Sequence, residues 1–240
     1  KIPFVLASAR SPKGMQHLAE ALGISEYPLA CYNGALVLAN GNLSAPPISS
    51  HEVAIKEVVR IISETRTHFS QVSINLYSDT VWYVDRLDEW VKKEAAITQE
   101  VAQEADLLAL VQSLQIPVHK LLLIGTSAEI QKVKGYWEKQ SLKTSALYLS
   151  KDNYLEVTHR EVSKEKALME LASYYNVPLA QTLAIGDNFN DLPMILKAGV
   201  GVAMANAPRR VREQADAVTL SNKDSGVAAA LQKFVLSITS

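Results

Sequence analysis

The sequence predicts an α/β protein with a doubly wound parallel sheet and an α+β segment inserted into it. Three observations carry this prediction. From residue 163 onward, short apolar runs alternate with helical patterns, as they do in strand–helix–strand units. A strand pattern followed by a helix pattern also opens the chain at residues 2–22. Between them, residues 51–150 carry paired β-forming runs without this alternation, which is typical of an α+β insert.

Composition limits the possible classes of function. The chain has 240 residues, 48% of them hydrophobic, which is enough for a core domain with a smaller insert. The formal net charge of −1 gives no reason to expect nucleic acid or an anionic membrane as the main partner. The single cysteine, Cys31, excludes an internal disulfide and is interpreted as a small buried residue. No apolar run reaches the ~18 residues of a membrane helix and no basic-then-apolar leader is seen, so we expect a cytoplasmic protein.

The first elements are predicted from short apolar runs and a polar turn. Residues 2–7 are apolar enough for a buried strand, with Pro3 confined to its start. The small polar turn at 8–12 follows, and its hydroxyl and backbone N–H groups suit an anion. Residues 14–22 have the apolar stripe of a helix that Gly23 ends.

A second strand is expected at residues 27–31, followed by Asn33-Gly34. Asn-Gly favours a turn with positive φ, so these two residues form either a plain tight turn or a turn that also contacts a substrate. Residues 36–39 then continue as a hairpin-like partner, and residues 44–50, which contain two prolines, have the composition of a linker.

The inserted segment and the C-terminal part complete the predicted order. The insert is expected to contain helices at 52–63 and 127–140, an antiparallel pair at 72–76 and 81–84, and strands at 118–124, 145–149 and 154–157. The C-terminal part is expected to contain a helix capped by Ser163, strands at 183–186, 200–204 and 217–220, short helices near 192–196 and 208–215, and a closing helix capped by Ser225. We therefore predict a core domain formed by residues 1–45 and 151–240, and an inserted domain formed by residues 46–150.

The most informative stretch directly follows the predicted strand at 183–186. Two carboxylates and two carboxamides fall within five residues, from Asp187 to Asp191. Ligands of open α/β sheets bind just beyond the carboxyl ends of strands, and carboxylates in such a turn suit Mg²⁺. The alternative is a solvated loop in which Asn and Asp only cap the next helix.

Three stretches taken together resemble a known family. Ser8-Ala9-Arg10 after a strand, Ser163-Lys164 before a helix, and Gly-Asp-Asn-Phe-Asn-Asp at 186–191 resemble motifs II, III and IV of the haloacid dehalogenase (HAD) superfamily. The resemblance is closer to its Cof-type phosphatases (cap subclass IIB), which carry an α+β cap between motifs II and III. Weaker matches are Tyr-Asn-Gly-Ala at 32–35, Val-Ala-Met-Ala-Asn-Ala at 202–207 and Asn-Lys-Asp-Ser-Gly-Val at 222–227. The resemblance spans nearly the whole chain and implies a Rossmann-like core with an inserted cap.

The resemblance also implies a chemistry: Mg²⁺-dependent hydrolysis of small phosphorylated metabolites, sugar phosphates among them, through an aspartyl-phosphate. It implies that the Ser8 hydroxyl and the Ala9 N–H hold phosphate oxygens, and that Lys164 neutralises the phosphoryl group. It further implies that Asp187 binds Mg²⁺, with Asp191 binding the ion or orienting its surroundings.

Other site residues are assigned less directly. The resemblance implies that Asn190 hydrogen-bonds the phosphate or steadies Lys164. Arg10, Asn33 and Gly34 are candidates for contact with the substrate, and each has a plain structural alternative as a surface or turn residue. Glu165, which follows Lys164 where the family commonly has glycine, adds a negative charge that weakens this match.

The sequence departs from the family in one major respect. The family's first motif, Asp-x-Asp-Gly-Thr, supplies the attacking aspartate, and no such string occurs among the 240 residues. Either this motif lies upstream of Lys1, or the protein is a non-catalytic relative that binds phosphorylated ligands. We expect the first, because Lys164 and Asp187 would otherwise have no acid to serve, and we then expect the 240 residues alone to be inactive. A phosphomutase on the same scaffold is a further alternative.

Overall fold

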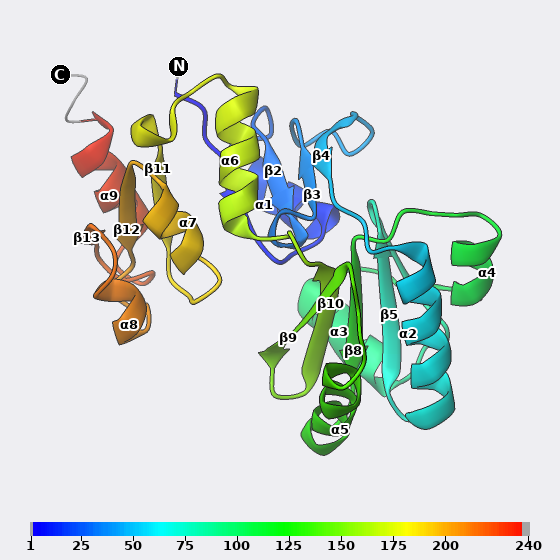
Figure 1. The fold of residues 1–240 in the computed structure, drawn as a ribbon. Coiled ribbons are helices and arrows are strands. Elements are labelled where there is room, and N and C mark those ends of the chain that lie inside the picture. Colours follow the sequence, from blue (N-terminus) through cyan, green and yellow to red (C-terminus); the bar gives the residue numbers. More distant parts are fainter. Residues whose placement is uncertain (1, 237–240) are drawn as a thin grey trace. The chain divides into compact units, whose positions relative to one another are not determined.

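The computed structural model describes residues 2–236. The chain divides into two compact units, residues 1–162 and 163–240, which are described one at a time. Figure 1 shows the elements of each. The alternation of strand and helix expected for an α/β fold is present, and the fold class is confirmed.

The first unit begins with a four-stranded sheet in the order β1-β2-β3-β4. Its strands are β1 (Leu6–Ala7), β2 (Leu29–Cys31), β3 (Leu36–Leu38) and β4 (Pro47–Ser50). The β1–β2 pair is parallel, because helix α1 (Pro12–Ala21) connects the two strands, whereas β2, β3 and β4 pair antiparallel through short turns. The 3₁₀ turn η1 (Tyr32–Gly34) links β2 to β3.

The same unit contains a six-stranded sheet in the order β7-β6-β5-β8-β10-β9. Its strands are β5 (Ser73–Ser78), β6 (Val81–Val84), β7 (Gln103–Glu104), β8 (Lys120–Ile124), β9 (Ser145–Lys151) and β10 (Tyr154–His159). Its helices are α2 (Ile55–His68), α3 (Glu89–Thr98), α4 (Leu107–Gln112) and α5 (Ser127–Glu138). Pairing within β5, β8, β9 and β10 is antiparallel, as an α+β insert requires.

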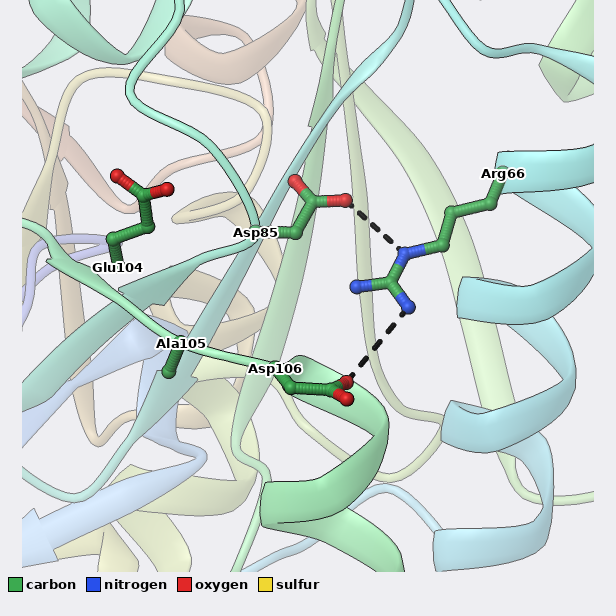
Figure 2. A pocket seen from close by; sticks show the side chains of 5 residues that line it. All are labelled: Arg66, Asp85, Glu104, Ala105 and Asp106. Atoms are coloured by element: carbon green, nitrogen blue, oxygen red, sulfur yellow. Dashed lines mark hydrogen bonds and ion pairs between the residues drawn. The ribbon is translucent and has the colours of Figure 1, made fainter.

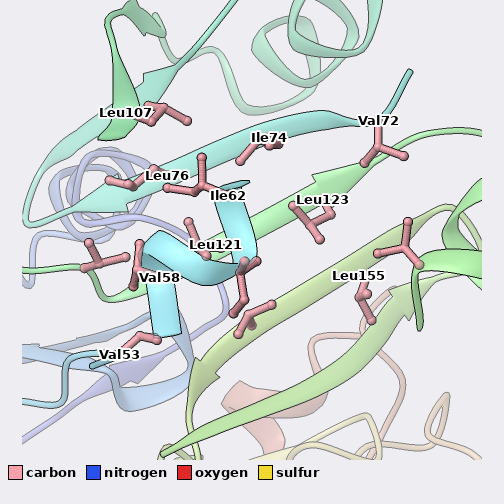
Figure 3. Packing of buried hydrophobic residues seen from close by; sticks show 14 of the residues in the cluster. Val53, Val58, Ile62, Val72, Ile74, Leu76, Leu107, Leu121, Leu123 and Leu155 are labelled. Atoms are coloured by element: carbon pink, nitrogen blue, oxygen red, sulfur yellow. The ribbon is translucent and has the colours of Figure 1, made fainter. Parts of the chain in front are cut away.

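The two faces of the six-stranded sheet differ in chemistry. Along β8, Leu121 and Leu123 point to an aliphatic core with helices α2, α4 and α5, which Figure 3 shows from close by. The alternate residues Leu122 and Ile124 belong to a second cluster that includes α3, α1 and the strands of the four-stranded sheet. Because successive side chains of a strand point to opposite faces, Lys120 shares its face with Leu122 and Ile124. Both faces of this sheet are therefore covered within the first unit.

The second unit is a parallel sheet in the order β11-β12-β13. Its strands are β11 (Leu183–Gly186), β12 (Val200–Ala203) and β13 (Ala217–Val218), and its helices are α6 (Lys164–Tyr174), α7 (Leu192–Lys197), α8 (Arg209–Arg212) and α9 (Gly226–Phe234), with a 3₁₀ turn η2 (Leu179–Gln181). Each strand is followed by a helix, which is the doubly wound pattern that the sequence predicts. Ser163 caps α6 as predicted, accepting a hydrogen bond from the Lys166 N–H.

Three sequence predictions are wrong in detail. The strand expected at 2–7 is limited to Leu6–Ala7, because only these residues pair with β2. Residues 44–50 are not only a linker: Pro47–Ser50 forms the edge strand β4, where proline is tolerated at the first position. Ser225 precedes α9 with a left-handed φ of 57°, and its side chain makes no capping hydrogen bond.

The predicted domain boundaries at 45/46 and 150/151 stay predictions. The six-stranded sheet continues beyond residue 150 into β10, which pairs with β8 and β9. Across residues 2–236, no helix combines the length and apolar character needed to cross a membrane.

Candidate functional site

The turn after β11 is built around the carboxylate of Asp191. Its Oδ2 accepts hydrogen bonds from the backbone N–H groups of Asp187, at 2.9 Å, and Asn188, at 3.0 Å. This closes the acidic stretch into a tight loop at the carboxyl end of a parallel strand, where ligands of such sheets bind. Asp191 is 4% exposed, so these bonds form in a buried environment that strengthens them.

Glycine at position 186 is required by this closure. A Cβ atom on Gly186 would lie 2.3 Å from the Cβ of Asp191 and 2.7 Å from its Cγ. Real atoms do not approach so closely, so any larger residue would displace the Asp191 carboxylate. The glycine of the motif is thus explained by its packing against Asp191.

Lys164 supplies the positive charge of the turn. It is the first residue of α6, and its Nζ donates a hydrogen bond of 2.5 Å to Oδ1 of Asp191. Both side chains are buried, which makes this pair a fixed element of the second unit rather than a surface ion pair. Asp191 therefore uses one oxygen to hold Lys164 and the other to hold the backbone of the turn.

Asp187 is exposed and is held by a residue that the sequence analysis did not assign. The Asn206 side-chain amide donates to Oδ2 of Asp187 at 3.0 Å, and Oδ1 of Asn206 accepts the backbone N–H of Asn222 at 2.8 Å. Both halves of the Asn206 amide are thereby engaged, so its orientation is fixed. The signal that could have found it is the match at 202–207, which contains this asparagine.

The donor set of this turn fits a hard divalent cation. Asp187 presents a carboxylate whose Oδ1 has no hydrogen bond to any of residues 2–236, and which is exposed to solvent. Mg²⁺ takes few protein carboxylates and keeps several waters, so one such ligand beside a substrate phosphate suffices. Both oxygens of Asp191 are engaged by Lys164 and backbone amides, and its assignment as a metal ligand stays a prediction. Asn190 is exposed in the same turn.

The first unit holds a second polar turn at residues 8–11. The Asn33 N–H donates to the Ser8 carbonyl at 2.7 Å, and the Tyr32 N–H donates to the Arg10 carbonyl at 2.9 Å. The Ser8 Oγ accepts the Arg10 N–H at 3.3 Å. The structure therefore brings together, within this unit, the predicted residues Ser8, Ala9, Arg10, Asn33 and Gly34.

Backbone conformation marks the 32–34 turn as unusual. Tyr32, Asn33 and Gly34 have φ values of 51°, 59° and 99°, so the positive φ predicted for Asn-Gly is confirmed. Left-handed conformation is common for glycine and asparagine but costs energy for tyrosine. Its buried ring, stacked at 6.1 Å on His119, holds Tyr32 in place.

A buried polar network joins this turn to the six-stranded sheet. The Asn33 Nδ2 donates to the Tyr148 hydroxyl at 3.2 Å, and that hydroxyl donates to Oε2 of Glu156 at 3.0 Å. Lys120 Nζ lies 3.7 Å from the same carboxylate and donates to the carbonyl of Ala9 at 3.4 Å. The sequence analysis missed Lys120, Tyr148 and Glu156, because each stands alone in an otherwise apolar or β-forming run.

Comparison with known proteins identifies the family. The model of the haloacid dehalogenase-like hydrolases matches residues 1–231, almost the whole chain. The chain belongs to this family. A Haemophilus influenzae protein named "Putative phosphatase" is 33% identical over 97% of this chain and 85% of its own length. YxeH of Bacillus subtilis, named in the same way, is 31% identical over 98% of this chain and 86% of its own.

The fold of this chain is shared by solved structures. A crystal structure of a Thermotoga maritima protein matches with a TM-score of 0.88 at 30% identity, covering 98% of this chain and 85% of that one. The predicted membership in the HAD superfamily is confirmed, while the assignment to its Cof-type phosphatases (cap subclass IIB) stays a prediction. The resemblance read from Ser8, Lys164 and the 186–191 turn is therefore correct.

None of the residues that line an open pocket of the first unit belongs to either turn. Figure 2 shows it lined by Arg66, Asp85, Glu104, Ala105 and Asp106. The Arg66 guanidinium is held by Asp85 at 3.1 Å and faces Asp106 at 4.0 Å. With its one cation paired and three carboxylates around it, this pocket disfavours a phosphate.

Cys31 takes no part in either turn's chemistry. It is fully buried, and burial, with a smaller contribution from the charge of Glu100, raises the pKa of its thiol well above the usual value. The thiol therefore stays protonated and non-nucleophilic, and the interpretation of Cys31 as a small buried residue is confirmed.

Proposed function

We propose that this chain is a Mg²⁺-dependent phosphatase that hydrolyses small phosphorylated metabolites, with sugar phosphates as the substrate class to test first. The observation that carries the proposal is the Lys164–Asp191–Asp187 arrangement, in which a buried lysine and an exposed carboxylate are held by one turn. Family membership supports it, since the relatives named above carry phosphatase names.

Each site residue of the second unit has a defined role in this proposal. Lys164 places a positive charge against the phosphoryl group and lets it approach a carboxylate. Asp191 fixes the Lys164 ammonium by accepting its hydrogen bond, while Asn206 fixes Asp187. Asp187 would hold Mg²⁺, which when bound neutralises phosphate charge. Asn190 would hydrogen-bond the phosphate or steady Lys164.

The roles proposed in the first unit rest on family resemblance. Ser8 would donate its hydroxyl and Ala9 its backbone N–H to phosphate oxygens, while Arg10, Asn33 and Gly34 would contact the substrate. No Asp-x-Asp-Gly-Thr string occurs among the 240 residues, so the proposal requires that turnover be tested on a protein that also supplies this motif. The cytoplasmic location stays a prediction.

The test is phosphate release by the full-length encoded protein from p-nitrophenyl phosphate and a panel of sugar phosphates. We expect hydrolysis that needs Mg²⁺, and a loss on the order of 10²–10³-fold in kcat for Asp187→Ala. Asp152→Ala, an exposed carboxylate in the β9–β10 turn, is the matched control and should leave kcat unchanged. Turnover that persists in EDTA or in Asp187→Ala would contradict the proposal, and retention of the phosphate on a second sugar hydroxyl would indicate a phosphomutase.

A further inference from the structure

Two histidines and a glutamate come together at the edge of the first unit's two sheets. His51 lies in the connection that leaves β4 for α2, His159 is the last residue of β10, and Glu161 follows it by two residues. One ligand atom from each of the three lies within 4.8 Å of the others. The imidazole rings of His51 and His159 are 6.3 Å apart and inclined by only 28°. Residues far apart in sequence are thus placed as neighbours.

We propose that His51, His159 and Glu161 form a Zn²⁺ site, separate from the Mg²⁺ site proposed at Asp187. Two imidazole nitrogens and one carboxylate are a donor set that suits Zn²⁺, with water in the fourth position. Mg²⁺ prefers oxygen ligands and octahedral geometry, so the two sites select different ions.

Geometry allows the three side chains to close around an ion. Zn²⁺ bonds of about 2.0–2.2 Å in a tetrahedron place ligand atoms roughly 3.3 Å apart. The present separation of up to 4.8 Å must therefore shorten by side-chain rotation. The two histidines are half-buried and Glu161 is exposed, which leaves them room to rotate.

The hydrogen bonds of His159, Arg160 and His119 are compatible with such an ion. The His159 Nδ1 accepts a long bond of 3.3 Å from the Glu161 N–H, which the ion would replace. The Arg160 guanidinium donates to the carbonyl of Leu142 at 3.0 Å, which holds that cation in an interaction of its own. His119 is excluded as a ligand, because its Nδ1 accepts the Asp79 N–H and its Nε2 contacts the Ser50 Oγ at 3.0 Å.

A bound ion would connect the two sheets of the first unit. His51 directly follows β4 of the four-stranded sheet, and His159 ends β10 of the six-stranded sheet. Zn²⁺ would therefore fasten the segment leaving one sheet to a strand of the other, and would stabilise the folded state that contains the site.

The experiment is calorimetric titration of the chelator-stripped full-length protein with Zn²⁺, in excess Mg²⁺ so that oxygen-ligand sites are filled. We expect one Zn²⁺ per chain, with affinity weakened about tenfold or more by His51→Ala or His159→Ala. Glu161→Gln should weaken it as well. His17→Ala, an exposed histidine on α1, is the matched control and should bind as the wild type does.

Two further measurements keep the result interpretable. Melting in EDTA reports whether the variants fold, and Zn²⁺ should raise the Tm of the wild type and of His17→Ala but not of His159→Ala. Replacement by Co²⁺ should give the visible bands of a tetrahedral ion in the wild type and in His17→Ala, and not in the double variant His51→Ala/His159→Ala. Zn²⁺ binding that is unchanged in the folded double variant His51→Ala/His159→Ala, or absent from the wild type, would overturn the proposal.

Discussion

Each unit of the molecule contains a buried lysine–carboxylate pair, and the two pairs are built differently. In the second unit, Lys164 and Asp191 meet at 2.5 Å, and the other oxygen of Asp191 accepts two backbone N–H groups. In the first unit, Lys120 and Glu156 are 3.7 Å apart. The Lys120 ammonium also lies 4.5 Å from the ring centroid of Tyr77. One pair is short and directional, whereas the other is spread over several partners.

The difference indicates that the Lys164–Asp191 pair positions a charge, whereas the Lys120–Glu156 pair connects two parts of the first unit. Because Asp191 also closes the backbone turn, the Lys164 pair fixes the place of a positive charge beside Asp187. The Lys120 pair instead ties a strand of the six-stranded sheet to the Ala9 carbonyl, through a bond of 3.4 Å. We therefore expect the first pair to control turnover and the second to control stability.

The largest effect is expected at Lys164. Lys164→Met removes the charge placed against the phosphoryl group and should lower kcat on the order of 10²–10³-fold. Lys166→Met, a lysine on the same helix, should change kcat by less than about twofold, because its ion pair with Glu170 is long, at 3.9 Å, and partly exposed. Steady-state phosphate release measures both. Equal losses in the two variants would show that turnover does not depend on Lys164 in particular.

Removal of Lys120 should lower the stability of the protein rather than its turnover. Lys120→Met leaves the Glu156 carboxylate buried with only the Tyr148 hydroxyl, which should destabilise the protein by about 3–5 kcal/mol. The double variant Lys120→Met/Glu156→Gln should recover much of this loss, because no unpaired charge remains. Urea unfolding of the two single variants and the double variant measures the coupling, and additive losses would show that the two groups do not interact.

The first unit should also be the acid-sensitive one. Burial lowers the pKa of His119 to about 4, while nearby Glu52 opposes and His51 assists this shift. The unfolded chain, with an ordinary histidine pKa near 6.5, therefore binds more protons than the folded one between these values. The free energy of unfolding contributed by His119 is complete above pH 6.5 and should be lost as pH falls toward 4, by about 3 kcal/mol. Denaturant unfolding at pH 6.5 and at pH 4 measures this loss of unfolding free energy in the wild type and in His119→Asn. A loss of the same size in the variant would exclude His119 as the source.

The next largest effect is expected at Gly186, which packs against Asp191. Gly186→Ala forces a Cβ onto Asp191 and should cost about 1–3 kcal/mol while lowering kcat, because the Lys164 partner moves. Gly135→Ala is the matched control, since a Cβ there meets nothing within 4 Å and its helix should gain stability. Thermal melts and phosphate release distinguish the two, and a Gly186→Ala variant with native kcat would show that the turn tolerates displacement.

The same contrast explains which of these residues could be predicted from the sequence. Asp187 and Asp191 could be proposed from the sequence, because the two carboxylates lie within five residues directly after a predicted strand, whereas Lys164 was assigned only through the family resemblance. Lys120 and Glu156 could not be proposed, because their partners come from strands that meet only after folding. Burial of a charge leaves no local pattern, and Lys120 simply precedes an apolar run.

The secondary structure was likewise predicted best where the sequence pattern is local. Long apolar or alternating stretches such as β5, β6 and β11 were placed correctly, because their periodicity is local. The edge strand β4 was taken as a linker, since Pro46 and Pro47 at its start signal a turn and its partner β3 lies across a loop. The helices α3 and α4 were not predicted from the sequence.

The smallest effect is expected at Asn206, and it tests whether positioning in the second unit extends beyond the lysine pair. Asn206→Ala removes the donor to Oδ2 of Asp187 and frees that side chain to rotate, without touching Lys164 or Asp191. Because a loosely held carboxylate must be ordered when the ion binds, the Mg²⁺ concentration for half-maximal activity should rise about tenfold while kcat at saturating Mg²⁺ stays near that of the wild type. Asn188→Ala serves as a control in the same turn, since within residues 2–236 its side chain hydrogen-bonds only the neighbouring Phe189 N–H. If kcat at saturating Mg²⁺ falls while the Mg²⁺ requirement is unchanged, Asn206 does not help to hold Asp187 for the metal. The hydrogen-bonded pair of Lys164 and Asp191 would then be the part of the site that positions charge.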